Sequence, residues 1–244
     1  MPIENCGPGG ASLHEVRGAD SPLLDVACKL FAEIFPEDLR YLPYLRACAL
    51  GQNPSHPRTY DHVWLVQQAG EWIGVRIFSY ITTRDFGHGA YIGFLPNRRG
   101  QGLGRWLVEQ TLAQLEEDAH LFGREGVKGY LVEVERPIDA DNGTECELRA
   151  KRLQFHRQCG GIILPVPYTE PVMIAGVDYI APEQMQAELP RPMHLMLIPT
   201  AAGRQAPGLD LLGFIYGIYY DVYRLPDGHE FVKRSTSFLL NGEG

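Results

Sequence analysis

The segment that most constrains the fold runs from Tyr91 to Trp106 and carries three glycines at alternate positions, 100, 102 and 104. An apolar stretch enters this glycine-rich loop. An amphipathic helical pattern follows it, with Leu107, Thr111 and Leu115 on one face. A buried strand that passes through a glycine loop into a helix is typical of α/β proteins. The chain is therefore expected to alternate strands and helices around one sheet.

The same segment predicts an anion-binding site. Glycines let the backbone approach a ligand closely and adopt positive φ angles. The first N–H groups of the following helix have no partner within the helix and lie at the positive end of its dipole. Arg98, Arg99 and Arg105 add charged donors that suit phosphate. The segment therefore predicts a loop that binds a diphosphate.

The spacing of the glycines narrows the choice of ligand. It fits neither the G-x-G-x-x-G fingerprint of dinucleotide-binding folds nor the G-K-S/T of a P-loop. It does match Q/R-x-x-G-x-G/A, over Arg99–Gly104. The segment thereby resembles the acetyl-CoA signature of the GNAT N-acetyltransferase superfamily.

The order of elements between residues 22 and 199 is also similar to that superfamily. Periodicity predicts helices over 21–36, 39–50, 107–115 and 147–159, and strands over 62–66, 72–81, 90–95, 130–134, 162–166 and 194–198. The resemblance implies an α/β fold with a mixed, splayed β-sheet of about six to seven strands, flanked by helices. We expect a flexible tail over 1–20, a GNAT-like acyl-CoA-binding domain over 21–200, and a C-terminal helical extension over 201–244, with an aromatic helix at 208–225 and a polar tail.

The resemblance also implies acetyl-CoA as co-substrate. Backbone groups of Phe94 and Leu95 would hold the pantetheine arm in the gap of the splayed sheet, and N–H groups of residues 99–104 would bind the pyrophosphate. The expected cofactor-binding residues are Phe94, Leu95, Arg98, Arg99, Gly100, Gln101, Gly102, Leu103, Gly104 and Arg105.

A later helix provides a candidate acid. In the superfamily a tyrosine there commonly protonates the departing thiolate, and the matching position here holds His156. An imidazole with a pKa near 6.5 can protonate a thiolate whose thiol has a pKa near 8.5. The alternative is a polar helix residue with no catalytic role.

Two groups are candidate bases. His88 lies eleven residues before Arg99, where some members of the superfamily place a catalytic glutamate. Glu133 and Glu135 share one face of a predicted strand, and carboxylates buried there need a partner or a function. For His88 the alternative is a solvated turn. For the carboxylates it is an ion pair with Arg136, Arg149 or Arg152.

The acceptor pocket is expected between the two N-terminal helices and the long connection at 165–192. Its expected lining is Tyr41, Tyr44, Tyr168 and Tyr179. The aromatic helix at 208–225 is expected to pack on the core. A second arrangement, packing on another subunit, would give a homodimer.

Composition excludes several classes of protein. The formal net charge of −8 disfavours broad contact with nucleic acid or anionic lipid, and no apolar run reaches the roughly 18–20 residues of a membrane helix. The five cysteines form no C-x-x-C pair, and no histidine spacing predicts a metal site. Residues 1–12 lack the basic and apolar regions of a secretory signal, which predicts a cytoplasmic protein.

The leading hypothesis is an N-acyltransferase that moves an acetyl or other acyl group from acetyl-CoA to a primary amine of a small molecule or peptide. The amine would attack directly in a ternary complex. The alternative is a non-catalytic acyl-CoA-binding or sensing protein of the same fold, suggested by the missing tyrosine. A third is a structural subunit that dimerises through the aromatic helix.

Overall fold

The computed structural model describes residues 2–3, 6–51, 58–171, 191–205, 208 and 210–241. Its strands are β1 (Pro2–Ile3), β2 (Ser12–Glu15), β3 (Thr59–Gln68), β4 (Glu71–Ile81), β5 (Gly87–Phe94), β6 (Gly129–Glu135), β7 (Ile162–Ile163), β8 (Tyr168–Glu170) and β9 (Arg191–Pro199). Its α-helices are α1 (Leu24–Ile34), α2 (Leu42–Leu50), α3 (Leu103–Leu121), α4 (Gly143–Gln158), α5 (Ala201–Gln205), α6 (Leu211–Tyr216) and α7 (Glu230–Asn241). Within these ranges, no helix has the length and apolar character needed to cross a membrane.

One mixed sheet organises the fold. Its order is β1-β2-β3-β4-β5-β6-β9-β7, and β8 also pairs with β9. Among the described strands, β5 and β6 form the single parallel pair. The predicted α/β class with a mixed sheet is confirmed, although the described part of the sheet has nine strands rather than about six to seven.

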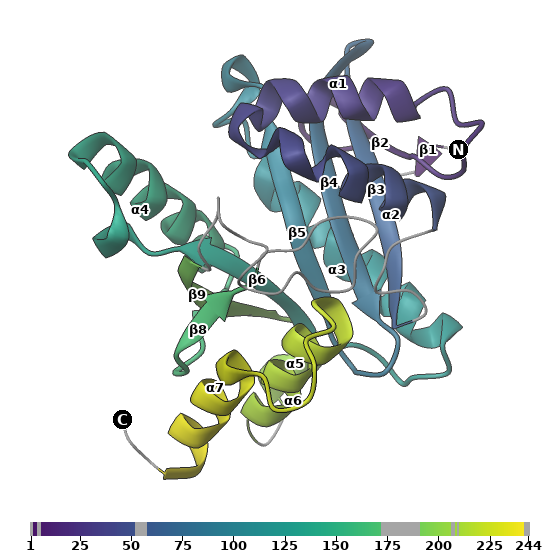
Figure 1. Ribbon diagram of the computed structural model, residues 1–244. Coiled ribbons are helices and arrows are strands. Elements are labelled where there is room, and N and C mark those ends of the chain that lie inside the picture. The colour runs from purple at the N-terminus through teal and green to yellow at the C-terminus, as the bar shows by residue number, and fades with distance from the viewer. Residues whose placement is uncertain are drawn as a thin grey trace.

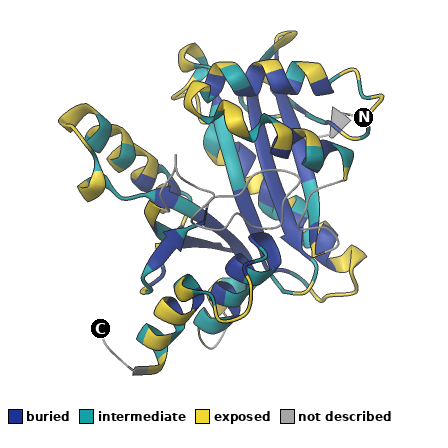
Figure 2. Cartoon of the chain, in the orientation of Figure 1, coloured by how far each residue is buried: buried dark blue, intermediate teal, exposed yellow. Residues whose placement is uncertain are grey.

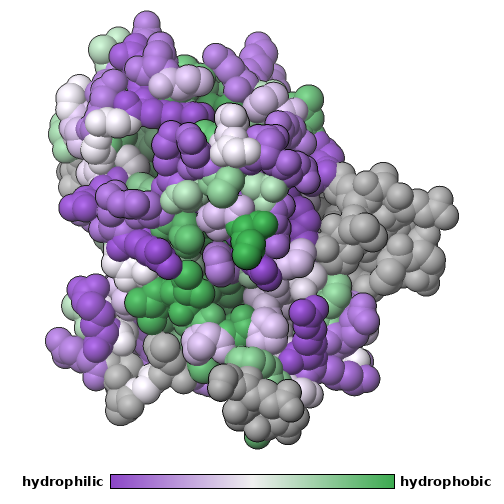
Figure 3. Space-filling view, turned by 90° about the vertical axis from the view of Figure 1, so that its left-hand side faces the viewer, coloured by the Kyte–Doolittle hydropathy of each residue, from purple (hydrophilic) through white to green (hydrophobic). Residues whose placement is uncertain are grey.

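Helices cover both faces of the sheet (Figure 1). Helices α1 and α2 pack against β4 and β3 on one side, called here the α1/α2 face, and α3 packs against β4 and β5 on the other. Helix α4 packs against β6, and its C-terminal end meets the N-terminal end of α3 on what we call the α3/α4 face. Buried residues concentrate on the central strands, whereas α4 is exposed along much of its length (Figure 2). On the side of the molecule that lies at the left in Figure 1, hydrophilic residues cover much of the surface and hydrophobic residues gather near the middle (Figure 3).

The sheet opens between β5 and β6. These strands pair only at Gly87–Gly89 with Tyr130–Val132, and beyond that point they diverge (Figure 1). A register shift opposite Ile77 and Phe78 of β4 marks the same place on β5. Such bulges bend a strand and increase its twist. The predicted splay is confirmed, and we call the opening the fork.

The N-terminal region differs from the predicted tail. Residues 12–15 form β2, which pairs with β3, and Leu13 is fully buried. Glu15 of β2 also accepts a hydrogen bond from His62 Nδ1 at 2.8 Å. This ion pair and the ladder of β3 hold the segment in place, so residues 12–15 are part of the sheet rather than a flexible tail.

The C-terminal region also differs from the prediction. The expected helix over 208–225 is α6 followed by a π-helical turn at Gly217–Val222, and the expected polar tail contains α7. Phe214 packs edge-on against Phe86, with ring centroids 4.9 Å apart. A Cβ on Gly217 would lie 2.4 Å from the Phe86 ring, so this extension packs closely on the core.

The region between the last predicted strands is rearranged as well. The strand expected over 162–166 is limited to β7, because Pro165 has no N–H to continue a ladder. Within the connection expected over 165–192, residues 168–170 form the short strand β8, which pairs with β9.

Candidate active site

The glycine loop has the backbone geometry that the sequence predicts. Gly100 and Gly102 both have a φ of +79°, which side-chain-bearing residues rarely adopt. Gly102 is the N-cap of α3, and no described side chain caps this helix. The first N–H groups of a nineteen-residue helix are therefore left for a ligand.

The third glycine has a packing role. A Cβ on Gly104 would lie 2.9 Å from the Phe155 ring of α4. Arg105 adds a second link between the helices, since its Nη2 donates to the Gln158 carbonyl at 3.2 Å. The glycine at 104 thus lets α3 and α4 approach each other beside the loop.

The other two arginines of the loop have different partners. Arg99 Nε donates to the Phe94 carbonyl at 3.1 Å and closes the turn. Arg98 forms an ion pair with Glu71, which offsets its charge. The exposed residues of the loop are Arg99, Gly100, Gln101, Gly102 and Arg105, whereas Leu103 is buried.

Phe94 and Leu95 differ in what they offer to a ligand. The N–H of Leu95 donates to the Ile73 carbonyl at 2.9 Å and so faces the neighbouring strand β4. Successive residues of a strand turn their backbone groups to opposite edges. Phe94 therefore turns its N–H toward the fork, while its carbonyl accepts from Arg99 and the N–H of Leu95 is already occupied.

A pocket opens at the fork on the α1/α2 face. It is lined by Tyr41, Tyr44, His88, Ala90, Tyr91, Glu133, Glu170, Pro171 and Tyr223. Tyr41 and Tyr44 were expected there from the sequence. Tyr168 does not line the pocket itself but donates a hydrogen bond to Glu133, which does. Tyr179 falls outside the described residues.

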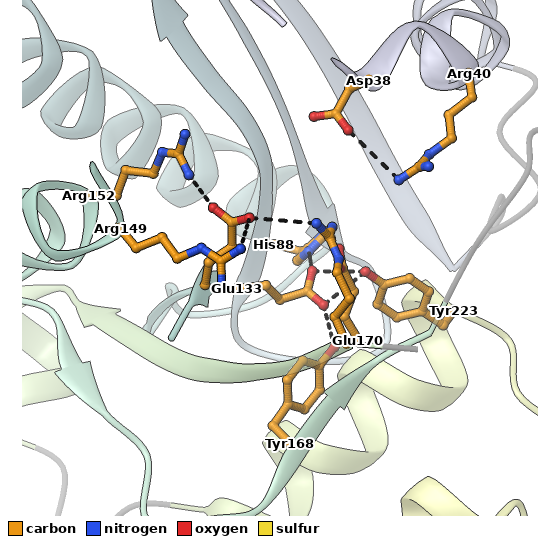
Figure 4. Close-up of polar contacts among 11 residues, drawn as sticks. Asp38, Arg40, His88, Glu133, Arg149, Arg152, Tyr168, Glu170 and Tyr223 are labelled. Carbon is orange, nitrogen blue, oxygen red and sulfur yellow. Dashed lines mark hydrogen bonds and ion pairs between the residues drawn. The ribbon is translucent and has the colours of Figure 1, made fainter. Parts of the chain in front are cut away.

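Glu133 is the centre of a hydrogen-bonded cluster in this pocket (Figure 4). His88 Nε2 lies 3.0 Å from its Oε2, and the Tyr223 hydroxyl donates to both carboxylate oxygens at 2.8 and 3.0 Å. The Tyr168 hydroxyl donates to Oε1. Burial, reinforced by the charge of Glu133, raises the pKa of Tyr168 and of Tyr223 well above the usual range, so both remain donors.

This geometry fixes the tautomer of His88. A carboxylate accepts but cannot donate, so Nε2 carries a hydrogen, and in the neutral ring Nδ1 then carries the lone pair. Nδ1 is buried and has no hydrogen-bond partner among the described residues. The arrangement of a carboxylate that orients an imidazole is suited to proton abstraction.

Glu135 is not part of this cluster. It pairs with Arg152, and it lies 3.9 Å from Arg149 and 3.6 Å from Arg191 (Figure 4). The alternation along β6 thus brings one carboxylate to His88, while the other takes the ion-pair role that the sequence left open.

His156 lies apart from His88 and Glu133. It is buried on α4, and burial together with the charge of Arg76 lowers its pKa to about 4. A Cβ on Gly89 of β5 would point toward Arg76. Since side chains alternate along a strand, the side chain of His88, one residue earlier, points to the opposite face of the sheet. At neutral pH His156 is therefore a neutral imidazole on the α3/α4 face.

Three groups at the site are missed by sequence reasoning. Glu170 and Arg191 form an ion pair at 2.8 Å, and they flank the undescribed residues 172–190. Burial and the nearby Glu133 raise the pKa of Glu170. Tyr223 is separated by 90 residues from Glu133, so no local pattern could have joined them.

Comparisons with known proteins agree with this geometry. Residues 24–125 match the model of the acetyltransferase (GNAT) family. No curated protein sequence matches the chain. A solved structure described as an acetyltransferase from the GNAT family of Bacteroides thetaiotaomicron has a TM-score of 0.57 at 18% identity, covering 88% of this chain and 99% of that one.

Two further solved structures are more distant. The ribosomal-protein-S18-alanine N-acetyltransferase from Escherichia coli has a TM-score of 0.46 at 15% identity, covering 78% of this chain and 93% of that one. The spermidine N-acetyltransferase from Vibrio cholerae, in complex with CoA and spermine, has a TM-score of 0.46 at 14% identity, with coverage of 77% and 95%. At 18% identity the likeness to the Bacteroides thetaiotaomicron structure concerns the fold, while the family model matches the sequence of residues 24–125. The resemblance predicted from the glycine loop is thus confirmed over residues 24–125, the part of the chain that matches the GNAT family model.

Proposed function

We propose that the chain is an acetyl-CoA-dependent N-acetyltransferase that acts on a primary amine of a small molecule or peptide. The observation that carries this proposal is the fork between β5 and β6. It runs from the glycine loop at 99–104 to the pocket that contains His88 and Glu133. The loop supplies a place for a diphosphate, and the pocket supplies a base for an amine.

The residues of the loop fit CoA. The uncapped N-terminus of α3 and the positive φ angles of Gly100 and Gly102 suit a diphosphate. The N–H of Phe94, which faces the fork, can donate to an amide carbonyl of the pantetheine arm, as in the pairing of an added strand. Bound there, acetyl-CoA supplies an acyl group activated as a thioester.

The pocket residues fit the handling of an amine. His88 is held by Glu133, which fixes the ring and stabilises the imidazolium formed when Nδ1 takes a proton. Because Nδ1 is buried, the amine or one water molecule must enter the pocket against the ring to reach it. The carboxylates of Glu133 and Glu170 favour a cationic amine over an anionic acceptor.

Calorimetry with CoA tests the loop. Replacing Gly102 with Val places a branched side chain at the cap, and we expect at least a tenfold loss of CoA affinity. Gly123→Val is the matched control: Gly123 has a φ of +72°, has open space, and lies just beyond the other end of α3. Both changes carry a backbone strain of about 1–2 kcal/mol. Unchanged affinity in Gly102→Val, or no binding by the wild type, would refute the proposal.

Turnover separates the enzyme from a sensor. Thiol release from acetyl-CoA is measured over a panel of primary amines, including small polyamines, amino acids and short peptides. We expect release with at least one amine. Tight CoA binding without release from any of them would favour the non-catalytic alternative.

A further inference from the structure

Arg76 of β4 is a buried cation beside the fork. Its side chain is 1% exposed and lies between two aromatic rings, with the guanidinium carbon 5.4 Å from the Phe78 centroid and 5.3 Å from that of Tyr130. Nε donates to Thr111 Oγ1 at 3.1 Å, and Nη1 donates to the Tyr91 carbonyl at 3.2 Å. The guanidinium is therefore held in one orientation by α3 and β5.

Among the described residues, no neighbouring carboxylate neutralises the charge of Arg76. No described carboxylate forms an ion pair with it, and its buried Nη2 has no hydrogen-bond partner in the described part of the chain. Burying an unpaired charge is costly, and buried charges are normally paired. An unpartnered N–H group on a fixed, buried cation therefore indicates a missing anionic or polar ligand.

The unpartnered nitrogen lies at the closed end of the fork. A Cβ on Gly89 would be 2.8 Å from Nη2 and 2.9 Å from the Tyr130 ring. Gly89 is the last residue of β5 that pairs with β6. A glycine is thus needed at the point where the strands separate, because the guanidinium lies against the backbone there.

The position suits the sulfur end of CoA. Phe94 is the last residue of β5 before the glycine loop. It lies five residues, or about 17 Å of strand, from Gly89. The arm between the diphosphate and the sulfur of CoA has the length of about four to five extended residues. A diphosphate held at the glycine loop would therefore place the sulfur near residues 89–91.

The titratable groups around Arg76 are uncharged at neutral pH, so Arg76 is the source of positive charge there. Burial, partly offset by Arg76, raises the pKa of Tyr130 to about 12, and burial raises the pKa of the Cys159 thiol. Burial and Arg76 lower the pKa of His156 to about 4. At neutral pH these three groups from β6 and α4 are uncharged, and His156 is a weak acid source for a thiolate.

We propose that Arg76 binds the sulfur of CoA as a thiolate, an inference that rests on the proposed function. Arg76 would thereby stabilise the leaving group, the role that the sequence predicts for His156. The amine nitrogen forms the C–N bond, its proton passes to His88, and the C–S bond breaks with its electron pair on sulfur. Nη2 of Arg76 then donates a charge-assisted hydrogen bond to the thiolate.

The test measures the acidity of bound CoA rather than turnover. Ultraviolet absorbance of the thiolate is followed against pH for CoA bound to the wild type, to Arg76→Met and to Arg76→Lys. In the wild type we expect a thiol pKa at least one unit below that of free CoA, which is tenfold in acidity. Arg76→Met should remove the shift, and Arg76→Lys should retain part of it.

A CoA analogue that lacks the sulfur provides the control. At alkaline pH, Arg76→Met should weaken CoA binding about tenfold and leave binding of the analogue unchanged. Equal losses for both ligands, or an unshifted thiol in the wild type, overturns the role of Arg76 while CoA binding stands. If the wild type binds neither ligand, the proposed function fails with it. If Arg76→Met does not fold, the wild-type and Arg76→Lys titrations decide.

Discussion

At the residue scale, Glu133 and Glu135 occupy alternate positions of one strand and have different partners. Glu133 accepts hydrogen bonds from His88 and two tyrosines, whereas Glu135 pairs with arginines. Arginines can neutralise a carboxylate, but neutral hydroxyls leave its charge in place. The charge that stabilises a protonated His88 is therefore that of Glu133.

Replacing Glu133 with Gln should lower kcat by about 100-fold, in the range of general-base catalysis. The amide removes the negative charge that stabilises the protonated imidazole. Steady-state rates with the amine identified in the panel measure the effect. Glu135→Gln is the control and should cost less than about threefold. Equal losses in the two variants would contradict the separate roles.

At the element scale, His62 joins β2, β3 and α3. Its Nδ1 lies 2.8 Å from Glu15 and its Nε2 lies 3.0 Å from Asp118. Burial lowers the pKa of His62, but the hydrogen bonds and charges of Asp118 and Glu15 outweigh it and raise the pKa to about 9. A charged imidazole therefore holds the N-terminal strand on the sheet.

This junction predicts a loss of stability in alkali. Because the folded pKa of His62 lies above its ordinary value of 6.5, its contribution is complete below pH 6.5 and is lost as pH rises through 9. The loss is about 3 kcal/mol, or roughly 5–10 °C in Tm. Thermal unfolding between pH 6 and 10 should show this decline in the wild type and much less of it in His62→Gln. Parallel pH profiles for the two proteins would contradict it.

The elements that sequence predicted are those with a regular period. Periodicity alone predicts β3, β4 and β6, which are apolar runs, and α3, which has an amphipathic face. The glycine loop indicates the order in which these elements follow one another. Strand β2 has one fully buried side chain, Leu13, and its other contacts come from distant residues. Its place depends on pairing with β3, which no local pattern can reveal.

The C-terminal extension shows that local sequence patterns also fail to predict part of the site. Its aromatic residues predict packing, and Phe214 and Tyr219 are buried as expected. Tyr223 directly follows the π-helical turn, and its hydroxyl donates to Glu133 at 2.8 Å. The extension thus contributes a side chain to the pocket, a role that depends on tertiary structure alone.

Tyr223→Phe should therefore affect catalysis as well as stability. It removes one hydroxyl that donates to Glu133, a charge-assisted bond worth about 1.5–3 kcal/mol. We expect kcat to fall about tenfold, and Tm to fall by roughly 3–10 °C as this bond is lost. Tyr216→Phe is the control, since Tyr216 stacks on Tyr220 at the surface of the same extension. An unchanged kcat in Tyr223→Phe would remove this tyrosine from the mechanism.

At the scale of the whole molecule, the sheet separates two charged regions. The pocket on the α1/α2 face holds Glu133 and Glu170, and the α3/α4 face holds Arg76. In the proposed reaction the cationic acceptor approaches the negative side and the thiolate forms on the positive side. Charge separation across the fork would then favour the direction of acyl transfer.

The overall charge adds to this effect over a longer range. A chain with a formal net charge of −8 attracts cations toward a pocket lined by carboxylates. We expect kcat/KM for a diamine to fall several-fold between low and physiological ionic strength, because salt screens interactions beyond about 8–10 Å. An amino acid acceptor of zero net charge should show little dependence. If both acceptors respond equally to salt, the contacts within the pocket, rather than the field of the molecule, determine acceptor capture.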